Sequence, residues 1–293
     1  MKRYLGIDVG GSSIKYAVYN QDGVKELGSE GSQVTVRDNL EFILNEFAEI
    51  INSKGKLDGV GISIPGGINS ETGDIIEGGA IRVLGGINIV EAMEGRTPYT
   101  IVAENDANCV ALAEKWIGAG VGVKNFVCVT IGTGIGGGIV LNNELYTGSN
   151  FFAGEFGYMI NQEFDDFSDI QIMSATSATI PFIKNVAVAL NVPVSTLDGK
   201  KVFAMIDEGN AVVVPVYRKW IRALSTGILN IGFALDPEKI LIGGGVSVVP
   251  RLIVDINEEL KHINPYSKHW SVEVCQQFND AGSIGAAYIA MNQ

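Results

Sequence analysis

The chain is poor in cysteine, histidine and basic residues. Its 293 residues include three cysteines, two histidines and only 21 lysines and arginines, against 33 aspartates and glutamates. The cysteines (Cys109, Cys128 and Cys275) are odd in number and far apart in sequence, so we expect buried free thiols and a cytoplasmic protein. The net charge of −12 disfavours partners such as nucleic acid or an anionic membrane surface.

Long apolar runs are also missing. No run approaches the roughly 18 residues that a membrane-spanning helix needs. The apolar stretch after Lys2 and Arg3 stops at Asp8, so we expect no signal peptide. Apolar residues still make up 46% of the chain, which is enough for a packed core and argues against disorder.

Strands and helices alternate along the chain, which predicts an α/β fold. A strand, a tight turn and a second strand are expected over residues 4–18, and Asp38 is expected to cap a helix. Further strands are expected at 60–64, 100–103, 126–131, 139–141, 239–242 and 270–275. Further helices are expected at 106–116, 174–190, 200–208, 211–235, 248–261 and after Gly282.

The pattern of the first segment returns later in the chain. A shift of 122 positions places Asp8 on Thr130 and Gly10 on Gly132. This weak internal repeat predicts two similar halves, with a cleft between them where a ligand would bind.

Asp8 follows the first predicted strand and precedes Gly10 and Gly11. Bare backbone N–H groups in such a turn can hold a phosphate. We interpret Asp8 as a carboxylate that orders Mg²⁺ through water, because magnesium keeps much of its hydration shell. Lys15 is a candidate for neutralising phosphate charge. The alternatives are an Asx turn that closes a hairpin and a solvated surface lysine.

A second glycine-rich segment occupies residues 132–138. Gly132 and Gly134 would let the backbone approach phosphate oxygens, and Thr133 could add a hydroxyl donor. The segment is not a dinucleotide fingerprint, because a strand and not a helix follows it, and it lacks the Gly-Lys-Ser/Thr ending of a P-loop. A glycine-rich bulged turn is the alternative.

Asp106 lies between the two glycine-rich segments, at the start of a predicted helix. The helix dipole would keep this carboxylate ionised, which suits a general base for a substrate hydroxyl, and Asn105 would hold a neighbouring hydroxyl. A plain N-cap is the alternative for Asp106. Glu155, on a Gly-Glu-Phe-Gly turn, could accept two hydroxyls of a vicinal diol or could be an exposed loop residue. The combination predicts phosphoryl transfer from a nucleotide to an alcohol.

Two further glycine pairs follow predicted buried strands. Gly66 and Gly67 form a turn that we expect to contact the acceptor, beside Asn105. Gly243 and Gly244 would admit a flat adenine or ribose, and a turn at a helix start is the alternative.

In this order, the motifs resemble those of the ROK family of sugar kinases, within the hexokinase–actin superfamily. The matching segments are Asp8-Val-Gly-Gly11, Glu104-Asn-Asp106, Thr130–Gly138, Gly154-Glu-Phe-Gly157 and Ile242–Gly245. The resemblance covers essentially the whole chain. It implies two actin-like (ribonuclease H-like) domains with a central cleft, at 1–118 and 119–293, with the helix near 282–291 packing back on the first.

The resemblance also implies ATP and Mg²⁺, transfer to the 6-hydroxyl of a sugar, and a homodimer. By the resemblance, Asp106 is the base, Asn105 and Glu155 bind sugar hydroxyls, and the glycine loops hold ATP.

The chain departs from most of the family at the zinc site. Tyr158 stands where most members have a histidine, and no cysteine lies between Cys128 and Cys275. We therefore expect no zinc and a metal-free loop at 159–175, with Tyr158 altering contacts near the sugar's anomeric end. A second departure is Gly78–Arg82, where many relatives carry a Pro-Asn sugar contact.

These departures resemble a zinc-less branch of the family that contains bacterial β-glucoside kinases. The sequence therefore predicts phosphorylation of the non-reducing glucose of a β-glucoside such as cellobiose. A glucokinase, a fructokinase or an N-acetylmannosamine kinase would share the same motifs. A non-catalytic sugar sensor and a remnant of a ROK-type repressor are further alternatives.

Overall fold

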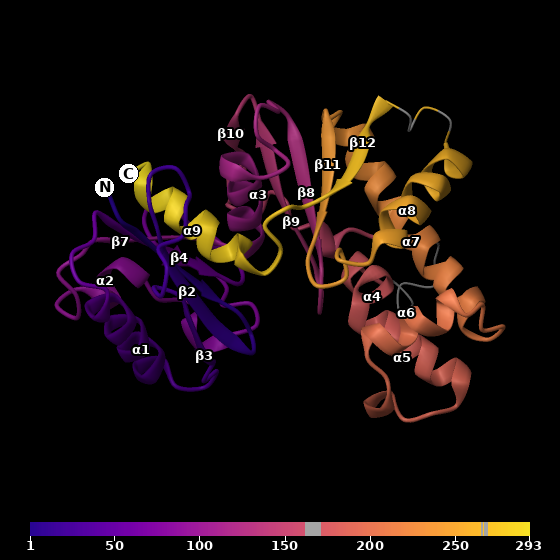
Figure 1. The fold of residues 1–293 in the computed structure, drawn as a ribbon, viewed down its shortest axis with the longest axis horizontal. Coiled ribbons are helices and arrows are strands. Elements are labelled where there is room, and N and C mark those ends of the chain that lie inside the picture. Colours follow the sequence, from indigo (N-terminus) through magenta and orange to yellow (C-terminus); the bar gives the residue numbers. More distant parts are fainter. Residues whose placement is uncertain (162–170, 265, 267–268) are drawn as a thin grey trace. The chain divides into compact units, whose positions relative to one another are not determined.

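The computed structural model describes residues 1–161, 171–264, 266 and 269–293 (Figure 1). The chain divides into two compact units. The first contains residues 1–122, 138–154 and 279–293, and the second contains residues 123–137 and 155–278. None of the described helices combines the length and the apolar character that a membrane span requires.

A five-stranded sheet forms the centre of the first unit, in the order β3-β2-β1-β4-β7. Its strands are β1 (Tyr4–Val9), β2 (Ser13–Tyr19), β3 (Gly31–Val34), β4 (Gly59–Ile64) and β7 (Ile101–Asn105). The strands β1, β4 and β7 are parallel, whereas β2 is antiparallel to both of its neighbours. The strands predicted over the segments of β1, β2, β4 and β7 are confirmed, and so is the α/β class.

Helices cover both faces of this sheet (Figure 1). They are α1 (Leu40–Ser53), α2 (Ile89–Met93), α3 (Asp106–Ile117) and α9 (Ala281–Met291), and the short strands of the unit are β5 (Ile68–Asn69), β6 (Asp74–Ile75) and β10 (Glu144–Leu145). Leu5 and Ile7 of β1 pack in one cluster with Phe47 of α1, whereas Tyr4 packs with residues of α3 and α9. The alternation along β1 thus supplies one core on each face.

The first helix begins one residue later than expected. Asn39, and not Asp38, is the N-cap of α1, and its side chain accepts a hydrogen bond from the backbone N–H of Phe42. The prediction of Asp38 as the cap is therefore wrong. Both residue types favour this position, so composition alone does not separate two neighbouring candidates.

A second five-stranded sheet has the order β10-β9-β8-β11-β12. Its longer strands are β8 (Phe126–Ile131), β9 (Ile135–Leu141), β11 (Lys239–Gly243) and β12 (Ser271–Val274). The helices of the second unit are α4 (Met173–Ser177), α5 (Thr179–Leu190), α6 (Gly199–Asp207), α7 (Val213–Leu235) and α8 (Pro250–Ile263). When the bounds of β1 and β2 are shifted by 122 positions, they coincide with those of β8 and β9, so the internal repeat is confirmed.

Two predicted elements of the second half are wrong in detail. The helix expected at 174–190 is two helices, because Ala178 between them has an extended backbone (φ −75°, ψ 162°). The return strand begins at Ile135 and not at Ile139. Glycines that seemed to belong to a turn therefore lie inside β9, where a methyl group on Gly137 would lie 2.2 Å from the Phe156 ring.

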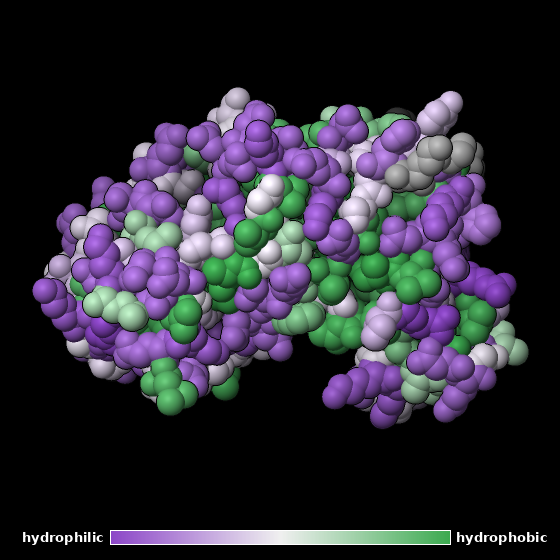
Figure 2. Space-filling view, turned by 45° about the horizontal axis from the view of Figure 1, so that its top comes forward, coloured by the Kyte–Doolittle hydropathy of each residue, from purple (hydrophilic) through white to green (hydrophobic). Residues whose placement is uncertain are grey.

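Hydrophilic residues cover much of the face drawn in Figure 2, in keeping with the net charge of −12. Hydrophobic residues reach this surface in smaller areas. A single exposed apolar side chain is common on this surface and does not indicate a binding site unless its neighbours do.

The helix α9 packs directly on bare backbone of β1 and β4. A methyl group on Gly6 would lie 1.8 Å from the carbonyl oxygen of Ser283, and one on Gly61 would lie 1.9 Å from that of Ala286. The backbone of α9 approaches these strand positions so closely that only glycine fits there, although glycine in the interior of a strand weakens the strand. The helix has small residues at the matching positions and is buried on nearly all sides.

We expect Gly6→Ala to lower the free energy of unfolding by about 3 kcal/mol or more, because the added methyl group must push α9 away from the sheet. Urea unfolding followed by circular dichroism measures this loss. The matched control is Gly199→Ala, since a methyl group there meets nothing within 4 Å. Equal stability of the two variants would contradict the close packing of α9.

Candidate active site

Three neighbouring parallel strands of the first unit end in polar side chains. Asp8 of β1 lies in register with Ser63 of β4, and Ser63 lies in register with Glu104 of β7. Adjacent strands are spaced by about 4.8 Å, so the three residues span about 10 Å. Ligands of α/β sheets bind beyond the carboxyl ends of the strands, and this edge is therefore the candidate site of the first unit.

The carboxylate of Asp8 is held by a neighbour that the sequence analysis did not identify. The hydroxyl Oγ of Ser63 donates a hydrogen bond to Oδ1 of Asp8 at 2.9 Å. Lys15 lies opposite Asp8 in β2. Burial raises the pKa of Asp8, whereas the hydrogen bond from Ser63 and the charge of Lys15 lower it. A single carboxylate fits a magnesium ion that is bound through its waters better than a magnesium ion held by a full set of protein ligands.

The turn after β1 is tied to its surroundings through Gly10. The backbone N–H of Gly10 donates to the carbonyl oxygen of Ser13 at 3.0 Å, and Thr35 Oγ1 donates to the carbonyl oxygen of Gly10 at 2.7 Å. A methyl group on Gly11 would lie 3.7 Å from a guanidinium nitrogen of Arg37. Arg37 therefore places a second cation near this turn, and no motif in the sequence pointed to it.

The catalytic candidate Asp106 is the first residue of α3, and Asn105 is its N-cap. Oδ1 of Asn105 accepts a hydrogen bond from the N–H of Asn108 at 3.0 Å, and Oδ1 of Asp106 accepts one from Ala107 at 2.8 Å. The alternative interpretation of Asp106 as a plain N-cap is therefore wrong. Asp106 is half-buried and lies in the first turn of α3.

A buried carboxylate supports this turn from behind. Glu104 is 3% exposed, and its Oε1 accepts from the N–H of Asn105 at 2.8 Å and from Nδ2 of Asn108 at 3.0 Å. Burial raises the pKa of Glu104 more than these hydrogen bonds lower it. Sequence reasoning gave Glu104 no role, because a glutamate that ends a strand carries no signal of burial.

The same turn is joined to Gly66 and Gly67. Nδ2 of Asn105 donates to the carbonyl oxygen of Gly66 at 2.9 Å. Gly66 has a φ of +101°, and a methyl group there would lie 2.0 Å from the carbonyl oxygen of Glu77, so only glycine fits. Asn105 keeps one N–H and one lone pair for a ligand. The structure thus brings together Asn105, Asp106, Gly66 and Gly67, four of the residues that the sequence analysis selected.

The Gly78–Arg82 segment lies against this turn. A methyl group on Gly79, whose φ is +51°, would lie 2.9 Å from the backbone nitrogen of Gly66. The segment that departs from the family pattern therefore supports the turn expected to contact the acceptor.

In the second unit, the turn from Gly132 to Gly134 joins β8 and β9. The N–H of Gly132 donates to the carbonyl oxygen of Gly134 at 2.9 Å, and the N–H of Thr179 donates to that of Gly132 at 3.0 Å. A methyl group on Gly132 would meet nothing within 4 Å, and Thr133 is exposed. The turn therefore leaves open space on its outer side.

Gly243, the last residue of β11, and Gly244 lie beside this turn. Gly243 is in register with Thr130 of β8, and Gly244 has a φ of +85°. A methyl group on Gly244 would lie 2.3 Å from the carbonyl oxygen of Ile131. Oγ1 of Thr179 is buried and has no hydrogen-bond partner among the residues described. The open outer side of the Gly132–Gly134 turn fits a nucleotide, whose phosphate oxygens can approach bare backbone there.

Glu155 immediately precedes a single helical turn, η2 (Phe156–Tyr158), and is half-buried. A methyl group on Gly157 would lie 2.3 Å from both the carbonyl oxygen of Ile135 and Oγ of Ser174, so this turn is packed tightly on the start of β9. Tyr158 is 60% exposed. The metal-free loop expected at 159–175 falls in large part on residues 162–170, which lie outside the described residues.

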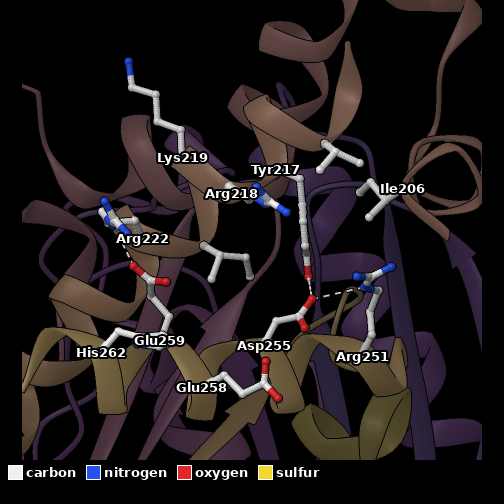
Figure 3. A pocket seen from close by; sticks show the side chains of 12 residues that line it. Ile206, Tyr217, Arg218, Lys219, Arg222, Arg251, Asp255, Glu258, Glu259 and His262 are labelled. Atoms are coloured by element: carbon white, nitrogen blue, oxygen red, sulfur yellow. Dashed lines mark hydrogen bonds and ion pairs between the residues drawn. The ribbon is translucent and has the colours of Figure 1, made fainter. Parts of the chain in front are cut away.

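A separate cavity of about 690 Å³ lies among α6, α7 and α8 of the second unit (Figure 3). Several of its polar and charged side chains are paired: Asp255 accepts hydrogen bonds from Tyr217 at 2.6 Å and from Arg251 at 3.1 Å, and Arg222 pairs with Glu259. Burial raises the pKa of Tyr217, which makes it unsuitable as a base near neutral pH. None of the predicted site residues lines this cavity, and we assign it no part in the reaction.

Known proteins resemble the chain along nearly its whole length. The ROK family model matches residues 4–293. The β-glucoside kinase of Listeria monocytogenes is 33% identical over 294 residues, which cover 98% of this chain and 96% of that protein. A ROK family protein from Streptococcus pneumoniae in complex with sucrose has a TM-score of 0.87 at 30% identity, covering 98% of this chain and 97% of that one. A ROK family glucokinase from Streptomyces griseus in complex with glucose and AMPPNP has a TM-score of 0.84 at 25% identity, covering 99% and 100%.

We expect Glu104→Gln to change the dependence of stability on pH. Because burial raises the pKa of Glu104, the folded protein keeps a proton that the unfolded chain loses above about pH 4.3. The wild type therefore loses stability as the pH rises from there to the raised pKa, and the loss is constant above it. Glutamine keeps the accepting oxygen but does not titrate, so the variant should gain in melting temperature relative to wild type over this window. A constant difference, like that of an exposed control such as Glu49→Gln, would contradict the assignment.

Proposed function

We propose that this chain, which belongs to the ROK family and is an ATP-dependent sugar kinase, phosphorylates the 6-hydroxyl of the non-reducing glucose of a β-glucoside such as cellobiose. The similarity to a β-glucoside kinase over 98% of the chain supports this acceptor. A glucokinase, a fructokinase and an N-acetylmannosamine kinase are the alternatives.

The observation that carries the proposal is the arrangement of the β7–α3 turn. Asn105 is the N-cap of α3, so Asp106 is not needed in that role. An ionised Asp106 takes the proton from the sugar 6-hydroxyl. The hydroxyl oxygen attacks the γ-phosphorus of ATP, the new O–P bond forms as the bond to the β–γ bridging oxygen breaks, and ADP leaves.

The acceptor is held by the residues around this turn. The remaining N–H and lone pair of Asn105 bind a hydroxyl next to the reacting one, and the backbone of Gly66 and Gly67 lines the same place. In the second unit, Glu155 is a candidate for binding sugar hydroxyls through the resemblance to the family, because a carboxylate can accept from both hydroxyls of a vicinal diol. These roles rest on the resemblance to the family and on the grouping of the first unit's residues.

Each unit, taken by itself, offers candidate residues for binding a nucleotide. In the first unit, Asp8 would order Mg²⁺ through water, and Lys15 with the backbone N–H of Gly11 would hold phosphate oxygens. Gly10 shapes the turn, because its own N–H donates to Ser13. In the second unit, the candidates are Gly132, Thr133 and Gly134 for phosphate and Gly243 and Gly244 for the nucleoside. Bound Mg²⁺ would neutralise charge on the phosphate oxygens, and the backbone N–H groups of the turns would stabilise the charge that develops during transfer.

We also propose a homodimer and a cytoplasmic location. The dimer follows from the resemblance to the family. The location rests on the cysteines, because Cys109, Cys128 and Cys275 are all buried free thiols, which suits a reducing compartment.

We expect Asp106→Asn to lower kcat by at least about 100-fold and to leave the KM for the sugar nearly unchanged, because the amide cannot accept the proton but keeps the shape of the turn. Steady-state kinetics with ATP regeneration measure both values. Asp38→Asn is the matched control, since Asp38 is exposed and does not cap α1. Turnover close to that of wild type would remove Asp106 from the role of base.

We expect cellobiose and aryl β-glucosides to be phosphorylated with a higher kcat/KM than glucose, fructose or N-acetylmannosamine. Coupled ATP consumption over this panel measures the ranking, and mass spectrometry identifies the phosphorylated ring. A preference for free glucose, with no reaction of the β-glucosides, would identify a glucokinase instead. The absence of phosphorylation of every sugar would point to a non-catalytic sensor.

A further inference from the structure

Two exposed apolar side chains border the Gly66–Gly67 turn of the first unit. Phe152 is 40% exposed and Ile76 is 47% exposed. A methyl group on Gly67 would lie 2.9 Å from Cζ of Phe152 and 3.6 Å from Cβ of Ile76. Both side chains therefore lie against the backbone of Gly67, and we refer to Phe152 and Ile76 as the apolar pair.

Each member of the pair is held in place by backbone hydrogen bonds. The N–H of Ile76 donates to the carbonyl oxygen of Gly67 at 2.8 Å. Phe152 lies in a loop closed by a bond of 3.1 Å from the N–H of Ala153 to the carbonyl oxygen of Thr147. The preceding residue, Phe151, has a φ of +61°, which is rare for a bulky side chain and persists only where the surrounding structure imposes it. The loop thus has a defined conformation that presents Phe152 beside the turn.

We propose that the apolar pair binds the aglycone of the β-glucoside, as a platform for the flat face of a second sugar ring or of an aryl group. This inference rests on the proposed function, because it assumes a glucoside in the site. The hydroxyls of the phosphorylated glucose need donors and acceptors, which Asn105 and the glycine turn offer. The side chains of the apolar pair offer neither donors nor acceptors. The phenyl ring of Phe152 can instead pack against the apolar face of a sugar or aryl ring in the aglycone.

The position of the pair agrees with this role. Asn105 is hydrogen-bonded to Gly66, and the apolar pair lies against Gly67. The apolar pair therefore borders the turn that is proposed to contact the glucose ring. Free glucose would leave the apolar surface of Phe152 in water, whereas an aglycone that covers it gains the free energy of burying that surface. The pair therefore discriminates a β-glucoside from glucose.

The test compares Phe152→Ala with wild type on glucose, cellobiose and an aryl β-glucoside. We expect kcat/KM for both glucosides to fall about tenfold, equivalent to about 1.4 kcal/mol, while that for glucose changes by less than about twofold. Phe152→Tyr keeps the ring and should retain glucoside activity, and Ile76→Ala should lower it in the same sense. The matched control is Phe42→Ala on α1, because Phe42 is 43% exposed and should leave all three substrates unaffected.

The outcomes separate the two proposals. If Phe152→Ala lowers kcat/KM equally for glucose and the glucosides, or lowers the melting temperature as well, then Phe152 supports the Gly67 turn. Either result would overturn the aglycone platform. Unchanged glucoside kinetics would overturn it as well. Loss with the aryl glucoside alone would narrow the platform to aromatic aglycones. If wild type phosphorylates glucose but neither glucoside, the β-glucoside function itself fails, whatever the variants do.

Discussion

The close approach of α9 to the sheet is the constraint on which the first unit depends. Backbone carbonyls of α9 lie where side chains of Gly6, Gly59 and Gly61 would otherwise stand. The same helix meets α3 through Gly285, where a methyl group would lie 2.0 Å from the carbonyl oxygen of Cys109. The position of α3, and with it that of the turn carrying Asp106, is therefore fixed by small residues of α9. A bulkier residue in any of these places would move the catalytic candidate relative to β1.

The first unit also contains two buried carboxylates, whose burial costs solvation free energy. Asp8 and Glu104 both have pKa values raised by burial, which means that their ionised forms are disfavoured by their surroundings. Hydrogen bonds offset part of that cost: Ser63 donates to Asp8, and two N–H groups donate to Glu104. A buried carboxylate needs such partners, and here the partners are in part the elements that shape the site. Glu104 fixes Asn105, and Asn105 caps α3.

The sequence predicted the order of strands and helices well, because alternating apolar residues and glycine turns are local signals. It also selected Asp8, Asn105, Asp106 and the glycine turns, since each lies at or just beyond the end of a strand. It missed Ser63 and Glu104, whose roles come from the register of three strands that are distant in sequence. The break at Ala178 was missed for a similar reason, because its extended backbone follows from packing and not from a helix-breaking residue. The assignments of individual residues to ATP, magnesium and sugar remain predictions.

In the glycine-rich segment of the second unit, the number of glycines does not indicate how many of them are available to a nucleotide. A methyl group on Gly132 would meet no atom within 4 Å, so this glycine is compatible with a ligand that approaches the backbone. Gly137 and Gly138 lie inside β9, and methyl groups there would strike Phe156 and Ala111. One run of glycines thus serves two requirements, an open turn and a tightly packed strand. Only the part that faces open space bears on nucleotide binding, and a sequence pattern alone does not separate it from the part that serves packing.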